Sequence, residues 1–490
     1  MRRLILSAIA LAVSLCASSN ALAAAPKTVY VRKDGKNICS GTKNLPFNFT
    51  LQCAKSTLQA GINTVAGRGT VKVAAGTYVE NVTVQKSVFV VGAGQGKTIV
   101  QPAVSSPAPC DDSSLCGGQA SNVFLVKAND VWIEGLTVDG QNPSKSGVIV
   151  EGADIDARNG IIEDHLSGIY KRLTVKNVEI KNVFLRGINA GSGGGGFVFT
   201  GNTVTNVRGG DGSVGIFAFA SSGTISGNTV TLANDAISVN QSRGVKITDN
   251  VVEQSGSGIH IDNNEAPAPG ILLDLIESNT VESCTPGGFG IWLLAPEGNA
   301  VVNNNTVSGC DVGLALLGGG ATSDITFSAN TLTGSGASNT AGIYVTTDTF
   351  SWGHVDTEAL FTANAVSGFE AGAFLDQGGG LTATVYFAGN HLQGALAAIE
   401  NKATVSVHGS CLSGSGKGLL NHETGTAAIH TSSIAGNTTA GVENLSATPV
   451  DATDNWWGSP TGPAPAGSGD AVVGAVSYDP YLNSSPVACD

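Results

Sequence analysis

A histidine and an aspartate lie two residues apart in a short alternating segment, and such a pair can move a proton. In the segment Gly258–Asp262 the two isoleucines are expected to point into a core, which leaves His260 and Asp262 on the opposite side. Histidine exchanges protons near neutral pH, and a neighbouring carboxylate can orient its ring. Asn240 is expected on the adjacent repeat, facing the same way. We predict His260, Asp262 and Asn240 as candidate catalytic residues. The competing interpretation is a solvated surface histidine with polar neighbours.

Five aromatic residues are expected on the same outward side of several repeats. They are Phe217, Phe219, Trp292, Tyr344 and Phe374. Aromatic rings present flat apolar faces on which the C–H faces of sugar rings can stack, so this series predicts a substrate-binding platform for a polysaccharide. The alternative is that the rings pack against one another or beneath loops.

A short run of oxygen-bearing side chains follows the histidine strand. Asp262, Asn263, Asn264 and Glu265 are of the ligand type that Ca²⁺ prefers. Their spacing matches no known calcium-binding loop, and an ordinary polar turn also explains them. We therefore expect no required cofactor and no dedicated metal site, with Ca²⁺ kept as an optional ligand.

The remaining charged residues are less well placed for catalysis. Glycoside hydrolysis uses two carboxyl groups at a defined separation, whereas Asp376, Glu400 and Glu443 fall on different repeats. β-Elimination of a polysaccharide needs a strong base such as an arginine. Arg186 is near the expected groove, but it is expected to precede its strand rather than lie on its outward face. Whether the chain is an enzyme, either a polysaccharide lyase or a glycoside hydrolase, stays open at this point.

A repeat along the chain must position these side chains. Each unit has a short β run, an Asn, Thr-Val or a relative, a few loop residues, and a Gly followed by apolar alternation. Asn tolerates the left-handed backbone of a sharp bend, and stacked Asn side chains can hydrogen-bond from one coil to the next. The recurrence of this residue at spacings of 22 to 34 residues indicates stacked coils. The marker positions are Asn177, Asn202, Asn228, Asn250, Asn279, Asn305, Asn330, Asn364 and Asn390.

Stacked coils of short strands predict an all-β fold, a single right-handed parallel β-helix with a short N-terminal capping helix. The helix is expected within residues 50–66, where Leu51, Ala54, Leu58, Ile62 and Val65 form one apolar stripe. We divide the chain into a signal peptide (1–23), an N-terminal segment with the capping helix (24–68), the parallel β-helix (69–450) and a C-terminal cap and tail (451–490). In the last part, the rings of residues 456 and 457 are expected to cover the open core.

The first 23 residues are typical of an export signal. Arg2 and Arg3 precede an apolar stretch, and Ala21-Leu22-Ala23 supplies small residues for cleavage. No other segment predicts membrane insertion.

Without the signal the chain has 23 basic and 38 acidic residues, an excess that disfavours nucleic acid and anionic membranes as partners. An anionic glycan would need a local basic patch or a bridging cation. We expect a monomer that is secreted, whether extracellular, periplasmic or attached to the cell surface.

Eight cysteines follow the signal, and an even number in an exported chain permits disulfides. Cys39–Cys53 and Cys110–Cys116 are the plausible local pairs. Free buried thiols are the alternative.

Residues 69–100 resemble the opening coils of the pectin-lyase-like superfamily, and the Asn-marked units from about 175 to 445 are similar to its parallel β-helix repeats. The closing Asn-Trp-Trp-Gly resembles that of many secreted β-helix proteins. The resemblance implies the fold and a groove along one strand ladder, but its catalytic motifs are absent, and a shared fold does not select a function. Two hypotheses remain: a protein that binds, and in one version cleaves, a polysaccharide along the outward ladder, or a non-catalytic surface or adhesin-like scaffold.

Overall fold

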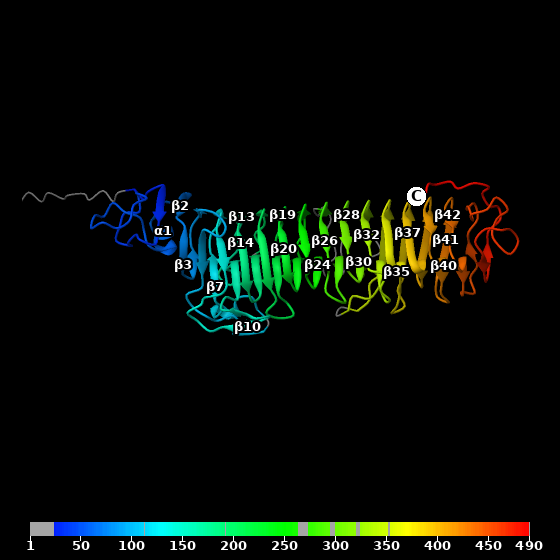
Figure 1. Cartoon of the computed structure of the whole chain (residues 1–490), viewed down its shortest axis with the longest axis horizontal. Helices are drawn as coiled ribbons and strands as arrows, with labels where there is room; N and C mark the ends of the chain where they lie inside the picture. The colour runs from blue at the N-terminus through cyan, green and yellow to red at the C-terminus, as the bar shows by residue number, and fades with distance from the viewer. Residues whose placement is uncertain are drawn as a thin grey trace, which may run out of the picture.

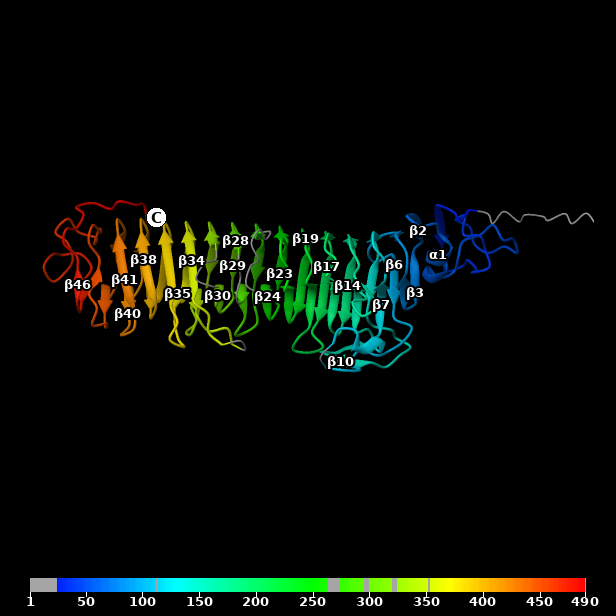
Figure 2. The same cartoon turned by 180° about the vertical axis from the view of Figure 1, so that it is seen from behind.

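The chain winds into one elongated solenoid of short parallel strands (Figure 1). The computed structural model describes residues 24–111, 113–191, 193–262, 273–294, 299–319, 324–350 and 353–489. The predicted export signal lies outside these ranges. Figure 2 shows the same stack of strands from behind, with a loop region around β10 (Val148–Val150) projecting from one side. The predicted right-handed parallel β-helix is therefore confirmed.

Each regular coil contributes three strands that pair in parallel with the coils on either side. Two consecutive coils illustrate the pattern, with Ile225 opposite Ile247, Val230 opposite Val252, and Ile237 opposite Ile259. The first strand of each coil joins a 17-stranded sheet, and the other two join a 27-stranded sheet. The strands of these coils are β19 (Gly223–Ser226), β20 (Thr229–Ala233), β21 (Asp235–Asn240), β22 (Lys246–Thr248), β23 (Val251–Glu253) and β24 (Ser257–Asp262).

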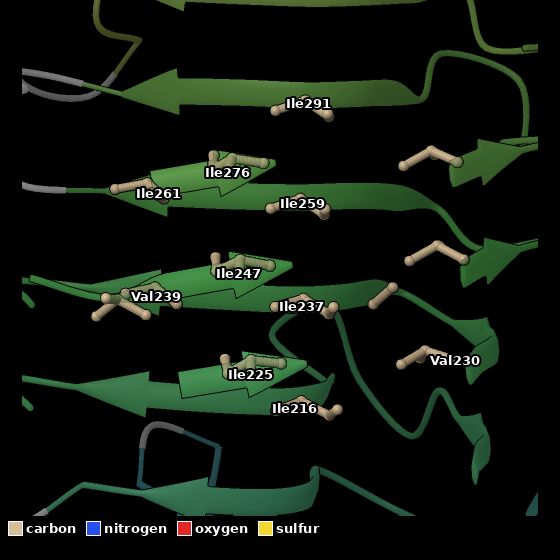
Figure 3. Packing of buried hydrophobic residues seen from close by; sticks show 14 of the residues in the cluster. Ile216, Ile225, Val230, Ile237, Val239, Ile247, Ile259, Ile261, Ile276 and Ile291 are labelled. Atoms are coloured by element: carbon tan, nitrogen blue, oxygen red, sulfur yellow. The ribbon is translucent and has the colours of Figure 1, made fainter. Parts of the chain in front are cut away.

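Aligned aliphatic side chains fill the interior of the solenoid. Ile216, Ile237, Ile259 and Ile291 stack on one wall and are fully buried (Figure 3). Because strands alternate their side chains between two faces, the residue that follows each of these isoleucines on its strand must point outward. Each buried isoleucine stabilises the fold by about 1.5–3 kcal/mol. The regular core thus fixes the direction of every outward residue.

An asparagine ladder closes the bend between the first and second strands of each coil. It runs without interruption from Asn202 to Asn390, and from Asn228 onward each amide oxygen accepts hydrogen bonds from the main-chain N–H and side-chain Nδ2 of the previous asparagine. Ser410, Ser432 and Asn455 extend it. The predicted bonding between coils is confirmed.

Two details of the ladder differ from expectation. The left-handed residue is the one before the ladder asparagine, for example Gly201 at φ 64° and Asn304 at φ 56°. Asn177 is also a left-handed residue of this kind, at φ 50°, and not a rung. Glu179 lies opposite Thr203, which places Val178 level with Asn202. The side-chain bonds, rather than the backbone conformation of asparagine, therefore explain its recurrence.

The N-terminal end is covered by a helix that is shorter than the apolar stripe predicts. Helix α1 spans Leu58–Thr64, and its N-cap Thr57 accepts a hydrogen bond from the Ala60 N–H. Leu51, which we expected on the buried stripe, is 61% exposed. Residues 50–57 instead form an irregular segment that the Cys39–Cys53 disulfide ties down. No helix of the described chain is long and apolar enough to cross a bilayer.

Strands also occur in the segments that we expected to flank the β-helix. In the N-terminal segment, β1 (Thr28–Val31) pairs in parallel with β2 (Gly69–Val73). In the C-terminal segment, β45 (Val472–Val473) and β46 (Val476–Ser477) pair with the last coil. Trp457 is fully buried at that end and packs edge-on against Tyr478, whereas Trp456 is only half-buried.

Four disulfides join all eight cysteines that follow the predicted signal. The predicted pairs Cys39–Cys53 and Cys110–Cys116 are present. Cys284–Cys310 connects neighbouring coils, and Cys411–Cys489 holds the C-terminal tail, which folds back along the solenoid (Figure 1). The alternative of free buried thiols is therefore wrong.

Candidate functional site

A single outward column follows the third strand of each coil and collects most of the predicted site residues. Parallel pairing fixes its order, and neighbouring members are separated by about 4.8 Å, the spacing of adjacent strands. The members are Asn189, Phe217, Ser238, His260, Trp292, Ala315, Tyr344, Phe374, Glu400, Leu420 and Glu443. A second column two residues further along contains Phe219, Asn240 and Asp262. We call the surface formed by the two columns the groove.

His260 is buried in the groove rather than solvated. Only 7% of the residue is exposed, and its ring stacks on Trp292 with centroids 3.5 Å apart and planes 8° from parallel. Trp292 is itself fixed by a hydrogen bond of 2.7 Å from its Nε1 to Ser257 Oγ. The Nδ1 atom of His260 faces Ser238 Oγ at 3.4 Å, while Nε2 is buried without a hydrogen-bond partner among the described residues. The histidine is thus held rigidly with one nitrogen unsatisfied.

The structure brings Asn240 and Asp262 together but gives the histidine a different carboxylate. Asn240 lies directly opposite Asp262, and its Oδ1 accepts a 2.7 Å hydrogen bond from Ser238. Among the described residues, the carboxylate oxygen nearest the ring nitrogens of His260 is Asp235 Oδ2, 3.9 Å from Nδ1. Burial raises the pKa of the Asp262 carboxyl, which the nearby His260 lowers to a smaller extent. Asp262 Oδ1 is buried and has no hydrogen-bond partner in the described chain.

The five predicted aromatic residues differ in how much of each ring is free. Phe217 is 8% exposed and is covered by the guanidinium of Arg186, whose Cζ lies 4.2 Å from the ring centroid. Phe219, in contrast, is 39% exposed. Tyr344 and Phe374 stack on each other at 5.6 Å, and the Lys402 ammonium lies 4.8 Å from the Phe374 centroid. With Trp292 stacked on His260, Phe219 offers the most accessible face of the series.

The amino-terminal end of the groove opens into a cavity of about 550 Å³, which we call the amino-terminal cavity. Its lining includes Ser114, His165, Arg186, Asn189, Phe219 and Asn240. Burial lowers the pKa of His165, so this ring is neutral at neutral pH. The cavity joins three predicted site residues, Phe217, Phe219 and Asn240, to four that the sequence did not predict as site residues, namely Ser114, His165, Arg186 and Asn189.

A loop closed by a disulfide forms one wall of this cavity. Cys110–Cys116 constrains it, and the buried Arg158 donates hydrogen bonds to the carbonyl oxygens of Pro107 and Ser113 at 3.0 and 3.1 Å. Arg158 therefore stabilises this loop.

A second cavity, of about 360 Å³, lies further along the groove. Its lining includes Asn339, Tyr344, Glu370, Phe374 and Glu400. His422 Nε2 lies 2.9 Å from Glu400 Oε1 and orients that carboxylate. On this coil Leu420 occupies the outward column, and His422 follows β40 (Lys417–Asn421). We call this the carboxyl-terminal cavity. Its two carboxylates come from neighbouring coils, and Glu370 was not selected from the sequence.

The groove holds no clear metal centre within the described chain. Of the described residues, no three of the types His, Cys, Asp and Glu lie close enough together to hold an ion. Three members of the predicted calcium run, Asn263, Asn264 and Glu265, lie outside the described ranges.

Comparison with solved structures shows the fold and nothing finer. The tailspike protein of E. coli bacteriophage HK620 in complex with a pentasaccharide is 13% identical, with a TM-score of 0.54, and the alignment covers 92% of this chain and 81% of the tailspike. A mutant of that tailspike with pentasaccharide is 12% identical, covers 83% and 76%, and has a TM-score of 0.52. Polygalacturonase from Erwinia carotovora ssp. carotovora is 15% identical, covers 73% and 95%, and has a TM-score of 0.44. No curated protein matches the sequence.

One family model matches the sequence in two overlapping stretches, residues 79–268 and 196–386. Its description is "Periplasmic copper-binding protein (NosD)". A periplasmic family agrees with the predicted export.

The described residues do not fit a copper site. Copper prefers thiolate, thioether and imidazole ligands. All eight cysteines after the signal are in disulfides, and the single methionine of the sequence is Met1. His408 and His430 lie opposite each other on neighbouring strands, but each of them has hydrogen-bonding threonine partners. The described part of the chain therefore offers copper no matching set of ligands.

The family match and the fold agree with each other. The matched stretches contain the asparagine ladder from Asn202 to Asn364, the outward column from Asn189 to Phe374 and both cavities' aromatic residues. Together they span more than half of the 490 residues, so the chain belongs to the NosD family.

Proposed function

We propose that the mature chain is an exported protein that binds an extended polysaccharide along the groove, from the amino-terminal to the carboxyl-terminal cavity. Five strand spacings separate Phe217 from Tyr344, which is about 24 Å. An elongated polymer fits such a groove better than a compact ligand does. The pentasaccharide held by the tailspike, a protein of the same fold, supports this class of ligand.

The observation that carries the proposal is a set of buried polar atoms without hydrogen-bond partners. Asn189 Oδ1, His260 Nε2 and Asp262 Oδ1 all lack a partner among the described residues. A buried polar atom costs free energy unless water or a ligand satisfies it. Sugar hydroxyls both donate and accept hydrogen bonds, so a bound glycan would satisfy acceptors and donors along the groove. Copper is not part of the proposal.

Cleavage of the bound polymer is a further step of the same proposal. His260, Asp262 and Asn240 remain its candidate residues. A buried carboxyl with a raised pKa keeps its proton to higher pH, which suits Asp262 to donate a proton to a departing oxygen. The rival function, a non-catalytic scaffold, predicts neither binding in the groove nor turnover.

The test is a glycan-binding screen of the purified mature chain, with Ca²⁺ and with EDTA. Tyr344→Ala should abolish binding, whereas Tyr386→Ala should leave it unchanged, because Tyr386 is exposed on β36 (Ala383–Ala388) of the other sheet. If no glycan binds, or if both variants bind as the wild type does, the groove is not the binding site.

Turnover is measured separately on any glycan that binds, as new reducing ends or unsaturated ends. His260→Ala and Asp262→Ala should abolish it. If both variants retain turnover, the catalytic residues lie elsewhere.

A further inference from the structure

Arg186 places a positive charge in the amino-terminal cavity of an otherwise acidic protein. It begins β15 (Arg186–Ala190), and its guanidinium lies over Phe217 at 4.2 Å. We expected Arg186 to precede its strand without facing the groove. That expectation is wrong, because Arg186 lies opposite Val214 in the strand pairing and lines the cavity. With 38 acidic residues against 25 basic ones, the sequence elsewhere disfavours anions.

The contacts of Arg186 fix its position without neutralising its charge. Nε lies 3.3 Å from Ser114 Oγ, and Nη1 donates to the Gly212 carbonyl oxygen. No carboxylate of the described chain lies within 4.0 Å of its nitrogens. Asp235 acts on it only from a longer range. A guanidinium offers five N–H donors, so several remain for a ligand.

Burial lowers the pKa of Arg186 to about 10, and the side chain therefore stays protonated at neutral pH. The desolvation that lowers the pKa also makes an anion at this place more favourable, because charges attract more strongly where water is excluded. The planar, always charged guanidinium can donate two parallel hydrogen bonds, which suits a carboxylate, sulfate or phosphate group.

A neighbouring asparagine supplies an independent sign of a ligand. Asn189 lies on the same strand, lines the same cavity and is only 2% exposed, yet its Oδ1 has no described hydrogen-bond partner. An amide oxygen accepts hydrogen bonds and cannot bind an anion, so its natural partner is a hydroxyl. Phe219, on the next coil, adds an accessible ring face.

From these three side chains we infer that the amino-terminal cavity binds an acidic saccharide residue. Its anionic group would pair with Arg186, a hydroxyl would donate to Asn189 Oδ1, and the ring would lie against Phe219. This inference rests on the proposed function and narrows it to polysaccharides that carry carboxylate, sulfate or phosphate groups. Arg186 thereby supplies the local positive charge that an anionic glycan requires on an acidic protein.

The experiment compares acidic glycans with their neutral counterparts on the full mature chain. Immobilised oligosaccharides carrying carboxylates, sulfates or phosphates are each paired with the methyl ester, the desulfated form or the dephosphorylated form. At least one acidic member should bind about 10- to 100-fold more tightly than its counterpart, the range of a charge-assisted hydrogen bond. The preference should weaken with added salt.

Variants of Arg186 test whether the preference for acidic glycans comes from the amino-terminal cavity. Arg186→Gln should abolish it, and Arg186→Lys, which keeps the charge but loses the fork, should retain part of it. Arg208→Gln is the matched control, because it removes the same charge from a residue that pairs with the exposed Glu151. Thermal unfolding of each variant shows whether it is folded.

The outcomes separate the inference from the proposed function. Equal binding of acidic and neutral members overturns the inference and leaves glycan binding intact. A preference that survives in Arg186→Gln also overturns it. If the wild type binds no glycan of either kind, the proposed function fails and the inference fails with it. Should Arg186→Gln not fold, the wild-type comparison and Arg186→Lys still decide the matter.

Discussion

Two stacks of polar side chains run along the same solenoid, and they differ in whether their hydrogen bonds are complete. In the asparagine ladder, Asn279 donates to Ile247 O and Asn305 Oδ1, and its own Oδ1 accepts from the main-chain N–H and the Nδ2 of Asn250. In the groove, Asn189 is buried to almost the same degree but leaves Oδ1 without a partner in the described chain.

The difference distinguishes side chains that stabilise the fold from side chains that can bind a ligand. A polar stack with every atom paired stabilises the coils, since each unpaired atom would cost about 1–3 kcal/mol. A polar stack with unpaired atoms has no such structural explanation. Buried groups of this kind are therefore the ones to which a ligand adds most.

The largest effect is expected from breaking the ladder. Asn279→Leu leaves Asn250 N–H, Asn250 Nδ2 and the Ile247 carbonyl short of partners, and each unsatisfied group costs about 1–3 kcal/mol. We expect the free energy of unfolding, measured by urea titration, to fall by about 3–6 kcal/mol. A loss below about 1 kcal/mol would contradict the structural role of the ladder.

The same substitution in the groove should cost far less stability. Asn189→Leu removes an oxygen that already lacks a partner, and replacing an unsatisfied group by an apolar one of similar shape is nearly neutral, within about 1 kcal/mol. Glycan affinity should fall about tenfold, since one hydrogen bond to the ligand is lost. Asn189→Leu and Asn279→Leu serve as each other's control. Equal destabilisation by both would make Asn189 a structural residue and remove the contrast.

The sequence predicts the ladder well because the ladder is periodic. A fixed spacing of asparagines follows from bonds between equivalent residues of adjacent coils, and so the fold, the outward direction of His260 and the pairing of Asn240 with Asp262 were all predictable. Asn177 was misassigned because the left-handed residue before a rung also favours asparagine. Local sequence alone does not separate the two positions.

The groove is less predictable because its walls come from outside the repeat. The Arg186 side chain meets Ser114 across 72 residues of sequence, and no period connects them. Glu370 and Glu400 share a cavity although they lie on different coils, because the pairing of Phe374 with Glu400 brings the coils into register. The stacking of His260 on Trp292 depends on rotamers that alternation does not specify.

A pH series tests the unpaired carboxyl of Asp262. Burial raises the pKa of Asp262 above its ordinary value of about 3.9, so the folded chain holds this proton to higher pH than the unfolded chain does. The free energy of unfolding therefore falls as the pH rises from the unfolded-state pKa of Asp262 to its folded-state pKa. This loss is absent below the unfolded-state pKa. Asp262→Asn should raise the melting temperature relative to the wild type at neutral pH and lose that advantage near pH 3.

The control for this series is Asp249→Asn, which changes an exposed turn residue of the same coil. Its melting temperature should follow the wild type at every pH. An advantage of Asp262→Asn that does not vary with pH would show that ionisation of Asp262 is not its cause.

The smallest effect on stability is expected at the accessible ring of the amino-terminal cavity. Phe219 is 39% exposed, so Phe219→Ala should change the free energy of unfolding by less than about 1 kcal/mol, whereas Phe217→Ala, at a ring that is 8% exposed, should cost about 3 kcal/mol or more. Glycan affinity should show the reverse order. Removing the open face of Phe219 should weaken binding about three- to tenfold, in line with aromatic contacts of about 0.5–1.5 kcal/mol. Calorimetric titration with a glycan from the screen measures this change. If Phe219→Ala loses stability and keeps affinity, then its ring belongs with the paired, structural side chains, and the groove has no aromatic surface left to hold a sugar at this end.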